Sequence, residues 1–182
     1  MSRVIAGSAG GRRLATPPGR ATRPTSDRTR EGLFSSLDSL TGGLNGRSFL
    51  DLYAGSGAVG LEAASRGAAQ VTLVEREARA AKTIRSNVAT LAAQAVDVVE
   101  SAVERFLDRP PTRFEVVFID PPYADPVSDV LVRLCTGGWL AAGAVVCVER
   151  ASRDAALSWP DGIEAIRSRR YGDSALWYGR AS

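Results

Sequence analysis

Phe49-Leu-Asp51-Leu-Tyr-Ala-Gly55-Ser-Gly57-Ala-Val-Gly60 is an apolar run that passes into a glycine-rich turn. The residues that follow, Leu61-Glu-Ala-Ala-Ser65, have the composition of a helix. Glycines in a strand–turn–helix unit let a ligand approach the backbone, and the N–H groups at the helix start favour an anionic group. This stretch therefore predicts a nucleotide-like cofactor site in an α/β fold.

Two cofactors are compatible with this turn. Gly55, Gly57 and Gly60 match the dinucleotide fingerprint, and Glu75 lies 20 residues after Gly55, where an acid binds ribose in NAD proteins. Asp51 favours S-adenosylmethionine instead, because its charge suits a cationic donor and repels a pyrophosphate. The chain also has no histidine for hydride chemistry, and 182 residues leave little room for a separate substrate domain. We therefore expect S-adenosylmethionine, with NAD as the alternative.

A second motif, Asp120-Pro-Pro-Tyr123, follows the apolar run 114–119. The amino group of a nucleobase is a poor nucleophile because its lone pair is delocalised, so a site that methylates it must supply acceptors and a flat surface. Asp120 and the carbonyl of Pro121 can each accept one N–H, and Tyr123 offers a ring for stacking. Pro121 and Pro122 stiffen the loop. An ordinary proline turn after a strand is the alternative for this motif taken alone.

Strands and helices alternate after residue 48. Helical stretches such as 77–92 separate the first five apolar runs, which favours a parallel sheet covered on both faces. Two further runs flank Gly172-Asp-Ser174, a hairpin signal. We predict a seven-stranded, mostly parallel sheet that ends in an antiparallel hairpin, with strands near residues 48–53, 70–75, 95–100, 114–119, 143–149, 163–171 and 175–179.

Ligands in such sheets bind at the carboxyl ends of the strands. The glycine-rich turn and Asp120 end the first and fourth predicted strands, so the two motifs face one crevice if these strands are neighbours. Ser101 and Ala102 end the third strand at the same edge and could contact adenine, although an ordinary strand-to-helix turn is as consistent with them.

Composition limits the remaining possibilities. With 182 residues, 45% of them hydrophobic and 24% charged, the chain suits one globular domain plus an arm. It has no apolar stretch near the roughly 20 residues of a membrane helix and no signal-peptide core, so we expect a cytoplasmic protein. Cys135 and Cys147 form no Cys-x-x-Cys pair, which predicts free thiols and no metal site.

Positive charge is concentrated at the N-terminus. The first 30 residues carry seven arginines and one acid, for +6, whereas the remaining 16 bases and 19 acids sum to −3. Arginine binds phosphates and stacks on bases, so this asymmetry favours a nucleic-acid contact over a solvated tail. We predict a basic hairpin arm over residues 1–22, a catalytic domain over 23–182, and nucleic-acid contacts from Arg3, Arg12, Arg13, Arg20 and Arg23.

Together these residues resemble the RsmD-type bacterial methyltransferases, which modify guanine in 16S ribosomal RNA. The most specific stretch is Arg23-Pro-Thr-Ser-Asp-Arg-Thr-Arg-Glu-Gly-Leu-Phe34, and Gly137-Gly-Trp139-Leu and Tyr171-Gly-Asp-Ser174 are further likenesses. The resemblance implies a class I methyltransferase fold, S-adenosylmethionine as donor and methylation of the guanine N2 amine in the small ribosomal subunit. It also implies a helix over the donor, so that Thr25, Arg28, Arg30 and Glu31 line the site rather than bind RNA. Gly32 departs from what a helix favours.

These expectations define a candidate site. The catalytic residues are Asp120, Pro121, Pro122 and Tyr123, which hold a flipped-out guanine for direct transfer. The cofactor-binding residues are Thr25, Arg28, Asp51, Tyr53, Gly55, Ser56, Gly57, Glu75, Arg76, Ser101, Ala102 and Asp120. The expected partner is 16S rRNA or the 30S subunit, bound by a monomer. The alternatives are a DNA adenine methyltransferase and a non-catalytic RNA-binding protein on a methyltransferase fold.

Overall fold

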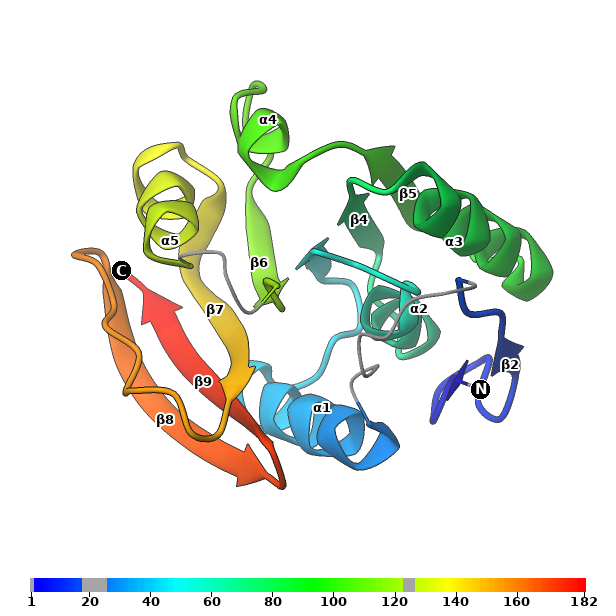
Figure 1. Cartoon of the computed structure of the whole chain (residues 1–182), viewed down its shortest axis with the longest axis horizontal. Coiled ribbons are helices and arrows are strands. Elements are labelled where there is room, and N and C mark those ends of the chain that lie inside the picture. The colour runs from blue at the N-terminus through cyan, green and yellow to red at the C-terminus, as the bar shows by residue number, and fades with distance from the viewer. Residues whose placement is uncertain (1, 18–25, 123–126) are drawn as a thin grey trace.

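The structure, a computed structural model, describes residues 2–17, 26–122 and 127–182. In these ranges a seven-stranded sheet forms the centre of the molecule (Figure 1), with strand order β5-β4-β3-β6-β7-β9-β8. Its strands are β3 (Ser48–Leu52), β4 (Gln70–Glu75), β5 (Val96–Glu100), β6 (Phe114–Ile119), β7 (Leu140–Ala151), β8 (Ile163–Tyr171) and β9 (Ser174–Ala181). β3 to β7 are parallel, whereas β9 runs antiparallel to both β7 and β8. The predicted parallel sheet with a terminal hairpin is confirmed.

Helices cover both faces of the sheet. One hydrophobic cluster includes side chains of α1 (Asp27–Thr41), α2 (Ala58–Ser65) and α3 (Ala78–Leu91), and a second cluster includes those of α4 (Val103–Leu107) and α5 (Val127–Thr136). Within β3, Phe49 belongs to the first cluster, whereas Leu50 and Leu52 belong to the second. Because side chains alternate along a strand, Asp51 faces the same layer as Phe49, which is the layer of α1 to α3.

α1 begins and ends at typical capping residues. The Ser26 hydroxyl accepts a hydrogen bond of 3.1 Å from the N–H of Thr29, and Gly42 ends the helix at φ 75° with its N–H bonded to the Asp38 carbonyl. A Cβ on Gly32 would lie 2.2 Å from Cζ of Tyr171. Glycine therefore occurs inside this helix because the Tyr171 ring lies directly against it.

The N-terminal segment forms a small hairpin that is docked on the domain. β1 (Ser2–Arg3) pairs antiparallel with β2 (Arg13–Leu14), and Val4 and Leu14 are buried in the first cluster. The carboxylate of Glu62, in α2, accepts backbone hydrogen bonds from Ile5 at 2.6 Å and Ala6 at 3.0 Å. The described part of the predicted arm is thus packed on α2. The predicted boundary between residues 22 and 23 lies outside the described residues.

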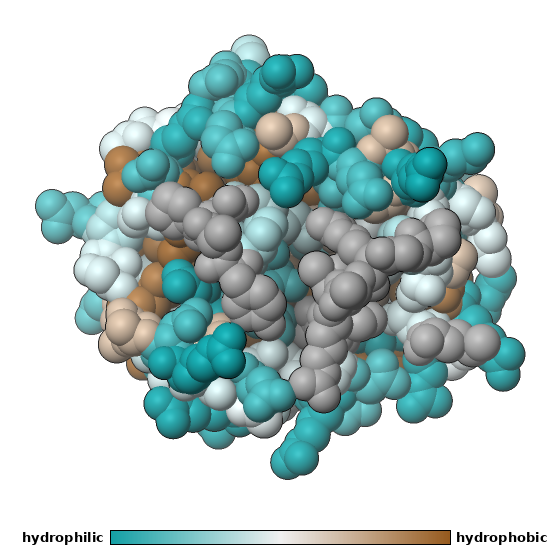
Figure 2. All heavy atoms as spheres, in the orientation of Figure 1, coloured by the Kyte–Doolittle hydropathy of each residue, from teal (hydrophilic) through white to brown (hydrophobic). Residues whose placement is uncertain are grey.

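The described surface is largely hydrophilic on the face in Figure 2. Over the whole described surface, the large hydrophobic side chains that are exposed are Val132 and Ile166. No described helix combines the length and the apolarity needed to cross a membrane. Cys135 and Cys147 are free thiols, half-buried and buried respectively.

Candidate active site

A cavity of about 930 Å³ lies at the carboxyl ends of the parallel strands. β3 pairs with β4 on one side and with β6 on the other. The strand order therefore reverses between β3 and β6, which makes this position a topological switch point. Such a switch point is where ligands bind in open α/β sheets, and the volume lies in the range of roughly 300–1,000 Å³ that small-molecule sites occupy. The prediction that the two motifs face one crevice is confirmed, because β3 and β6 are neighbours.

Strand register brings acidic residues into a row across this cavity. Asp51 in β3 pairs with Leu73 in β4 and with Phe118 in β6. Two residues further along these strands come Glu75 and Asp120, and side chains two apart share a face. All three acids therefore face the layer of α1 to α3.

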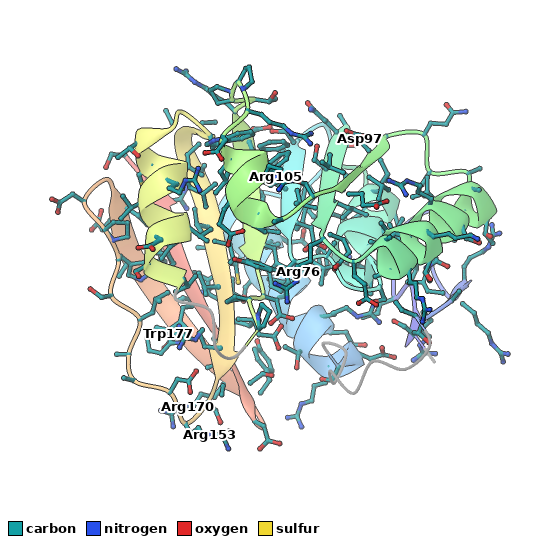
Figure 3. All side chains as sticks on the ribbon, turned by 45° about the horizontal axis from the view of Figure 1, so that its top comes forward. Arg76, Asp97, Arg105, Arg153, Arg170 and Trp177 are labelled. Carbon is teal, nitrogen blue, oxygen red and sulfur yellow. The ribbon has the colours of Figure 1, made fainter. Side chains whose placement is uncertain are left out.

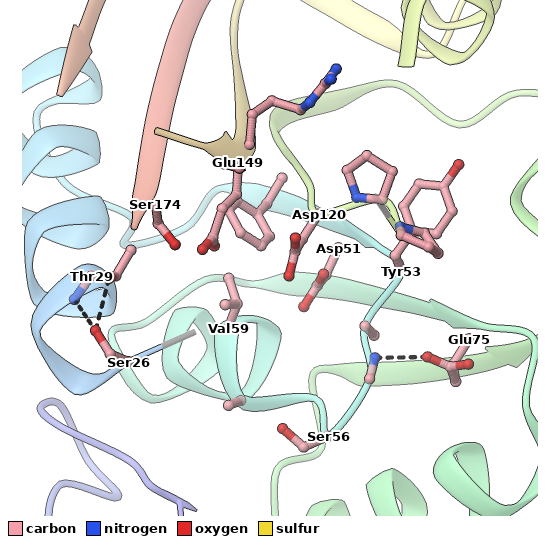
Figure 4. Close-up of a pocket in the computed structure, with 18 of the residues that line it drawn as sticks. Ser26, Thr29, Asp51, Tyr53, Ser56, Val59, Glu75, Asp120, Glu149 and Ser174 are labelled. Carbon is pink, nitrogen blue, oxygen red and sulfur yellow. Dashed lines mark hydrogen bonds between the residues drawn. The ribbon is translucent and has the colours of Figure 1, made fainter. Parts of the chain in front are cut away.

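Glu149 extends the row to a fourth strand. Phe118 pairs with Cys147 in β7, and Glu149 follows Cys147 by two residues. Figure 4 shows Glu149, Asp120, Asp51 and Glu75 around the same pocket. A row of four carboxyl groups at the ends of four adjacent strands makes this side of the cavity acidic, and an acidic surface favours a cationic ligand.

Asp51 caps helix α2 from outside the helix. Its Oδ2 accepts a hydrogen bond of 3.0 Å from the N–H of Gly60, while the N-cap residue Gly57 has no side chain to do so. Burial raises the pKa of Asp51 to about 8; the Gly60 hydrogen bond opposes that rise, and the charge of Glu75 adds to it. Asp51 is thus a carboxyl group whose ionisation a nearby positive charge would favour.

Glu75 holds the glycine-rich turn against β4. Its two carboxylate oxygens accept backbone hydrogen bonds from Gly55 at 2.8 Å and from Glu77 at 2.9 Å. These bonds fix a buried carboxylate at the cavity wall. The expected N–H donors of the turn are partly used within the protein, because Glu75 and Asp51 accept from Gly55 and Gly60.

The glycines of the turn have separate roles. Gly55 at φ 59° lines the cavity, whereas a Cβ on Gly60 would lie 1.9 Å from Cδ2 of Leu73. Gly60 therefore allows α2 to pack closely on β4. Gly57, also predicted for the cofactor site, is absent from the described lining residues: it caps α2 at φ 78°, and the side chain of Ile84 fills the space beside it.

The other predicted cofactor residues are mostly at the cavity. Ser101 lines it, but Ala102 does not: it is the N-cap of α4, where its extended backbone starts the helix. Thr25 lies outside the described residues. The predicted residues that do line the cavity are Arg28, Asp51, Tyr53, Gly55, Ser56, Glu75, Arg76, Ser101 and Asp120.

α1 contributes to the cavity with its first turn. Ser26, Arg28 and Thr29 line it, as the resemblance implied for Arg28. Arg30 does not: it is fully buried and donates to the carbonyl of Arg3 at 2.8 Å and to Asp27 at 2.7 Å. Successive helix positions point in different directions, so Arg30 faces away from the cavity that Arg28 and Thr29 line. Its hydrogen bonds tie the N-terminal hairpin to α1. Glu31 is exposed and is likewise absent from the described lining residues.

The second motif lies at the same cavity. Asp120, Pro121 and Pro122 line it, while Tyr123 lies outside the described residues. Tyr53, which follows β3, has φ 67°, a left-handed conformation that costs a non-glycine residue free energy. Strained residues of this kind cluster at functional sites, and Tyr53 lines this one.

The C-terminal part of the chain supplies a third wall, which the sequence did not indicate. Glu149 and Ser174 lie across the cavity from the glycine-rich turn in Figure 4. Arg150, Arg153 and Asp173 line the same wall. The only available signal was the likeness carried by Tyr171-Gly-Asp-Ser174, which implied no role for these residues.

These observations fit S-adenosylmethionine better than NAD. In NAD proteins the pyrophosphate lies at the N-terminus of the helix after the turn. Here the carboxyl group of Asp51 is bonded to Gly60 in the first turn of that helix, and Asp120 and Glu149 share its face of the sheet. A sulfonium suits this acidic surface, whereas a pyrophosphate does not. Among the described residues, no group of three or more His, Cys, Asp or Glu is arranged to hold a metal ion.

The fold and the site together define a class I, S-adenosylmethionine-dependent methyltransferase. The model of the family described as "Conserved hypothetical protein 95" matches residues 2–180, and the chain belongs to this family, the RsmD family. Ribosomal RNA small subunit methyltransferase D of Escherichia coli K12 is 40% identical over 148 residues, which cover 81% of this chain and 73% of that protein. The Haemophilus influenzae protein of the same name is 33% identical, with 93% and 89% covered. A solved structure described as "Putative methyltransferase yhhF from Escherichia coli" superposes with a TM-score of 0.89 at 34% identity, covering 99% of this chain and 97% of that one.

Proposed function

We propose that this protein transfers a methyl group from S-adenosylmethionine to the N2 amine of a guanine in 16S rRNA, in the cytoplasm. The observation that carries the proposal is that Asp120, Pro121 and Pro122 line the same cavity as Asp51 and Glu75. An acceptor loop for a planar amine and a donor site thus share one space. The names of relatives at 33–40% identity, which refer to the small-subunit rRNA, support the choice of substrate.

S-adenosylmethionine supplies a methyl group bound to a positively charged sulfur. Asp51 lies where its carboxylate can stabilise that charge, and Glu75 lies where an acid binds ribose hydroxyls. Arg28, in the first turn of α1, is one of the arginines that line the cavity and is our candidate to bind the carboxylate of the donor. Ser101, which follows β5 and lines the cavity, is our candidate contact for the adenine.

Asp120 and the carbonyl of Pro121 orient the target amine. Each accepts one N–H, which fixes the plane of the base and directs the nitrogen towards the donor. Asp120 need not be a strong base, because the amine loses its proton readily once it becomes cationic. Tyr123 remains the predicted stacking surface.

RNA contacts are proposed for the N-terminal hairpin. Arg3 and Arg13 are exposed on β1 and β2, and Arg12 is exposed beside them. Two of these side chains also make contacts within the protein: Arg3 with Asp27 at 3.2 Å, and Arg12 with the carbonyl of Thr90 at 2.7 Å. These contacts orient the two guanidinium groups, and both residues remain exposed to solvent. Arg20 and Arg23, predicted for the same role, lie outside the described residues.

Methyl transfer to three acceptors tests the function. Radiolabelled donor is supplied with unmodified 30S particles, naked 16S RNA or duplex DNA, and the labelled nucleoside is identified. Methylguanosine labelled at N2 in RNA is the expected product, and comparison of the first two acceptors shows whether an assembled particle is required. Label in DNA adenine, or donor binding without transfer to any acceptor, would overturn the proposal. Sedimentation of the protein alone tests whether it acts as a monomer.

A further inference from the structure

A second, smaller pocket lies between α1 and the edge strand β8. It has a volume of about 320 Å³ and is lined by Gly32, Ser35, Ser36, Ser39, Arg167, Arg169 and Tyr171. Ser35 and Ser39 are one helical turn apart and exposed, so their hydroxyl groups share one side of α1. No carboxylate belongs to this set of described residues. The pocket thus combines hydroxyl donors with two guanidinium groups.

Arg167 carries a positive charge that no described carboxylate neutralises. Its Nη2 donates to the carbonyl of Ser36 at a long 3.4 Å, its Nε is buried without a hydrogen-bond partner, and its guanidinium lies 5.7 Å from the ring centre of Tyr178. An incompletely satisfied guanidinium beside a polar pocket favours an anion there. Arg169, two residues along, points to the same face of β8 and is exposed.

The pocket adjoins the active-site cavity through Tyr171, which lines both. The β8 segment that lines the pocket is basic, since residues 165–171 contain three arginines and no acid. Figure 3 shows Arg170 and Arg153 at the same end of the β8–β9 hairpin, and Arg153 lines the larger cavity. Arginines therefore occur both in the small pocket and in the wall of the active site.

We propose that the pocket between α1 and β8 binds a backbone phosphate of the RNA, next to the nucleotide whose base enters the active site. This inference rests on the proposed function. Arginine and serine groups hold the phosphate and set the register of the strand, whereas the active-site cavity takes the base. The RNA strand then lies against β8, on the side of the cavity that the C-terminal strands form.

Arg169→Glu tests the proposal by reversing a charge on the exposed wall of the pocket. Affinity for naked 16S RNA is measured over a range of potassium chloride concentrations, together with affinity for S-adenosylmethionine. The expected loss of RNA affinity is about tenfold, and the slope of log K against log salt should fall by roughly 0.7–0.9, the value for one phosphate contact. Donor affinity should stay within about twofold of the wild type, since Arg169 is absent from the described lining of the cavity.

Two controls exclude a general charge effect and misfolding. Arg113→Glu makes the same change in an exposed residue at the start of β6, at the opposite end of the sheet, and should leave the salt slope unchanged. Ser39→Glu places a carboxylate in the pocket from α1 and should weaken RNA binding, whereas the uncharged Ser39→Gln should weaken it much less. Glutamate and glutamine both favour a helix at least as well as serine does, so α1 should remain folded.

The outcomes separate this proposal from the proposed function. If the wild type methylates RNA while Arg169→Glu and Ser39→Glu keep its affinity and salt slope, the phosphate pocket is wrong and the function stands. If RNA binding depends on Arg169 but no methyl group is transferred, the pocket stands and the function is wrong. A wild-type protein without affinity for RNA would overturn both.

Discussion

The carboxyl group of Asp51, from the end of β3, accepts a 3.0 Å hydrogen bond from the backbone N–H of Gly60 in the first turn of α2. The acid that we propose to face the donor therefore also caps the helix of the glycine-rich turn. Burial raises the pKa of Asp51 to about 8, so the group is largely protonated at pH 7 when no donor is bound. If Asp51 faces the sulfonium as proposed, donor binding should release a proton.

Donor affinity should depend on pH between about 6 and 8. A sulfonium favours the ionised form of Asp51, so binding releases a proton and becomes tighter as pH rises. The dependence is at most about tenfold per pH unit and levels off above the free-state pKa of about 8. Calorimetric titration with S-adenosylmethionine at several pH values measures it.

S-adenosylhomocysteine is the matched control ligand, because its sulfur is uncharged while its amino and carboxylate groups are the same. Its affinity should change less with pH over this range. Equal pH dependence for the two ligands would show that Asp51 does not sense the sulfonium.

Asp51→Asn should stabilise the free protein at high pH. Because folding raises the pKa of Asp51, its contribution to stability is fully present below the unfolded pKa near 3.9 and is lost as pH rises through about 8. Asparagine keeps an oxygen acceptor for Gly60 without a charge. Urea unfolding should therefore show a gain on the order of 1 kcal/mol or more at pH 9 and little difference below pH 4. A variant that is less stable at pH 9 would contradict the raised pKa.

Asp120→Ala should lose turnover while keeping donor binding. The residue follows β6 at the cavity, where its predicted role is to orient the target amine, so kcat should fall by about 10²–10³ and the Kd for S-adenosylmethionine should change little. Asp120→Asn keeps one acceptor oxygen and should lose less activity. Comparable losses of donor affinity and kcat in Asp120→Ala would refute this division of roles.

The strands and the position of the crevice could be predicted from local patterns. Alternating apolar runs and turn residues placed each strand within three residues of its observed bounds, and the two motifs lie at the edge where parallel strands end. The row of carboxyl groups could not be predicted, because Glu149 joins it only through the pairing of β7 with β6. Register between distant strands is set by packing, which a single sequence does not reveal.

The N-terminal region also depends on contacts between residues that are distant in the sequence, which could not be predicted. Arg30 and Glu62 are charged residues in helices, a class of residue that is usually exposed to solvent, but both are fully buried. Their partners lie in the hairpin, 27 residues from Arg30 at Arg3 and 57 residues from Glu62 at Ile5. The basic segment that we predict to contact nucleic acid thus also contains backbone groups that form hydrogen bonds with these two buried side chains.

Glu62→Ala should detach the N-terminal hairpin and destabilise the domain. The substitution leaves the N–H groups of Ile5 and Ala6 without an acceptor and removes the 2.8 Å contact from Nε of Arg66. The expected loss is about 2–4 kcal/mol in the free energy of unfolding. Hydrogen exchange should show faster exchange at Ile5 and Ala6 than at the strands of the sheet. Glu104→Ala, which removes an exposed glutamate from the short helix α4, is the control and should cost far less.

Gly32→Ala should have opposite effects on stability in the wild-type protein and in the Tyr171→Ala variant. Alanine favours a helix interior by about 1 kcal/mol over glycine, yet a Cβ at Gly32 would lie 2.2 Å from Cζ of the Tyr171 ring. Gly32→Ala should therefore destabilise the wild-type protein, because the ring must move away from α1, but should stabilise Tyr171→Ala by about 0.5–1 kcal/mol. Chemical unfolding of the two single variants and the double variant gives the coupling energy. Additive effects would mean that the ring does not rest against α1, and the shared wall of the two pockets would then lie elsewhere.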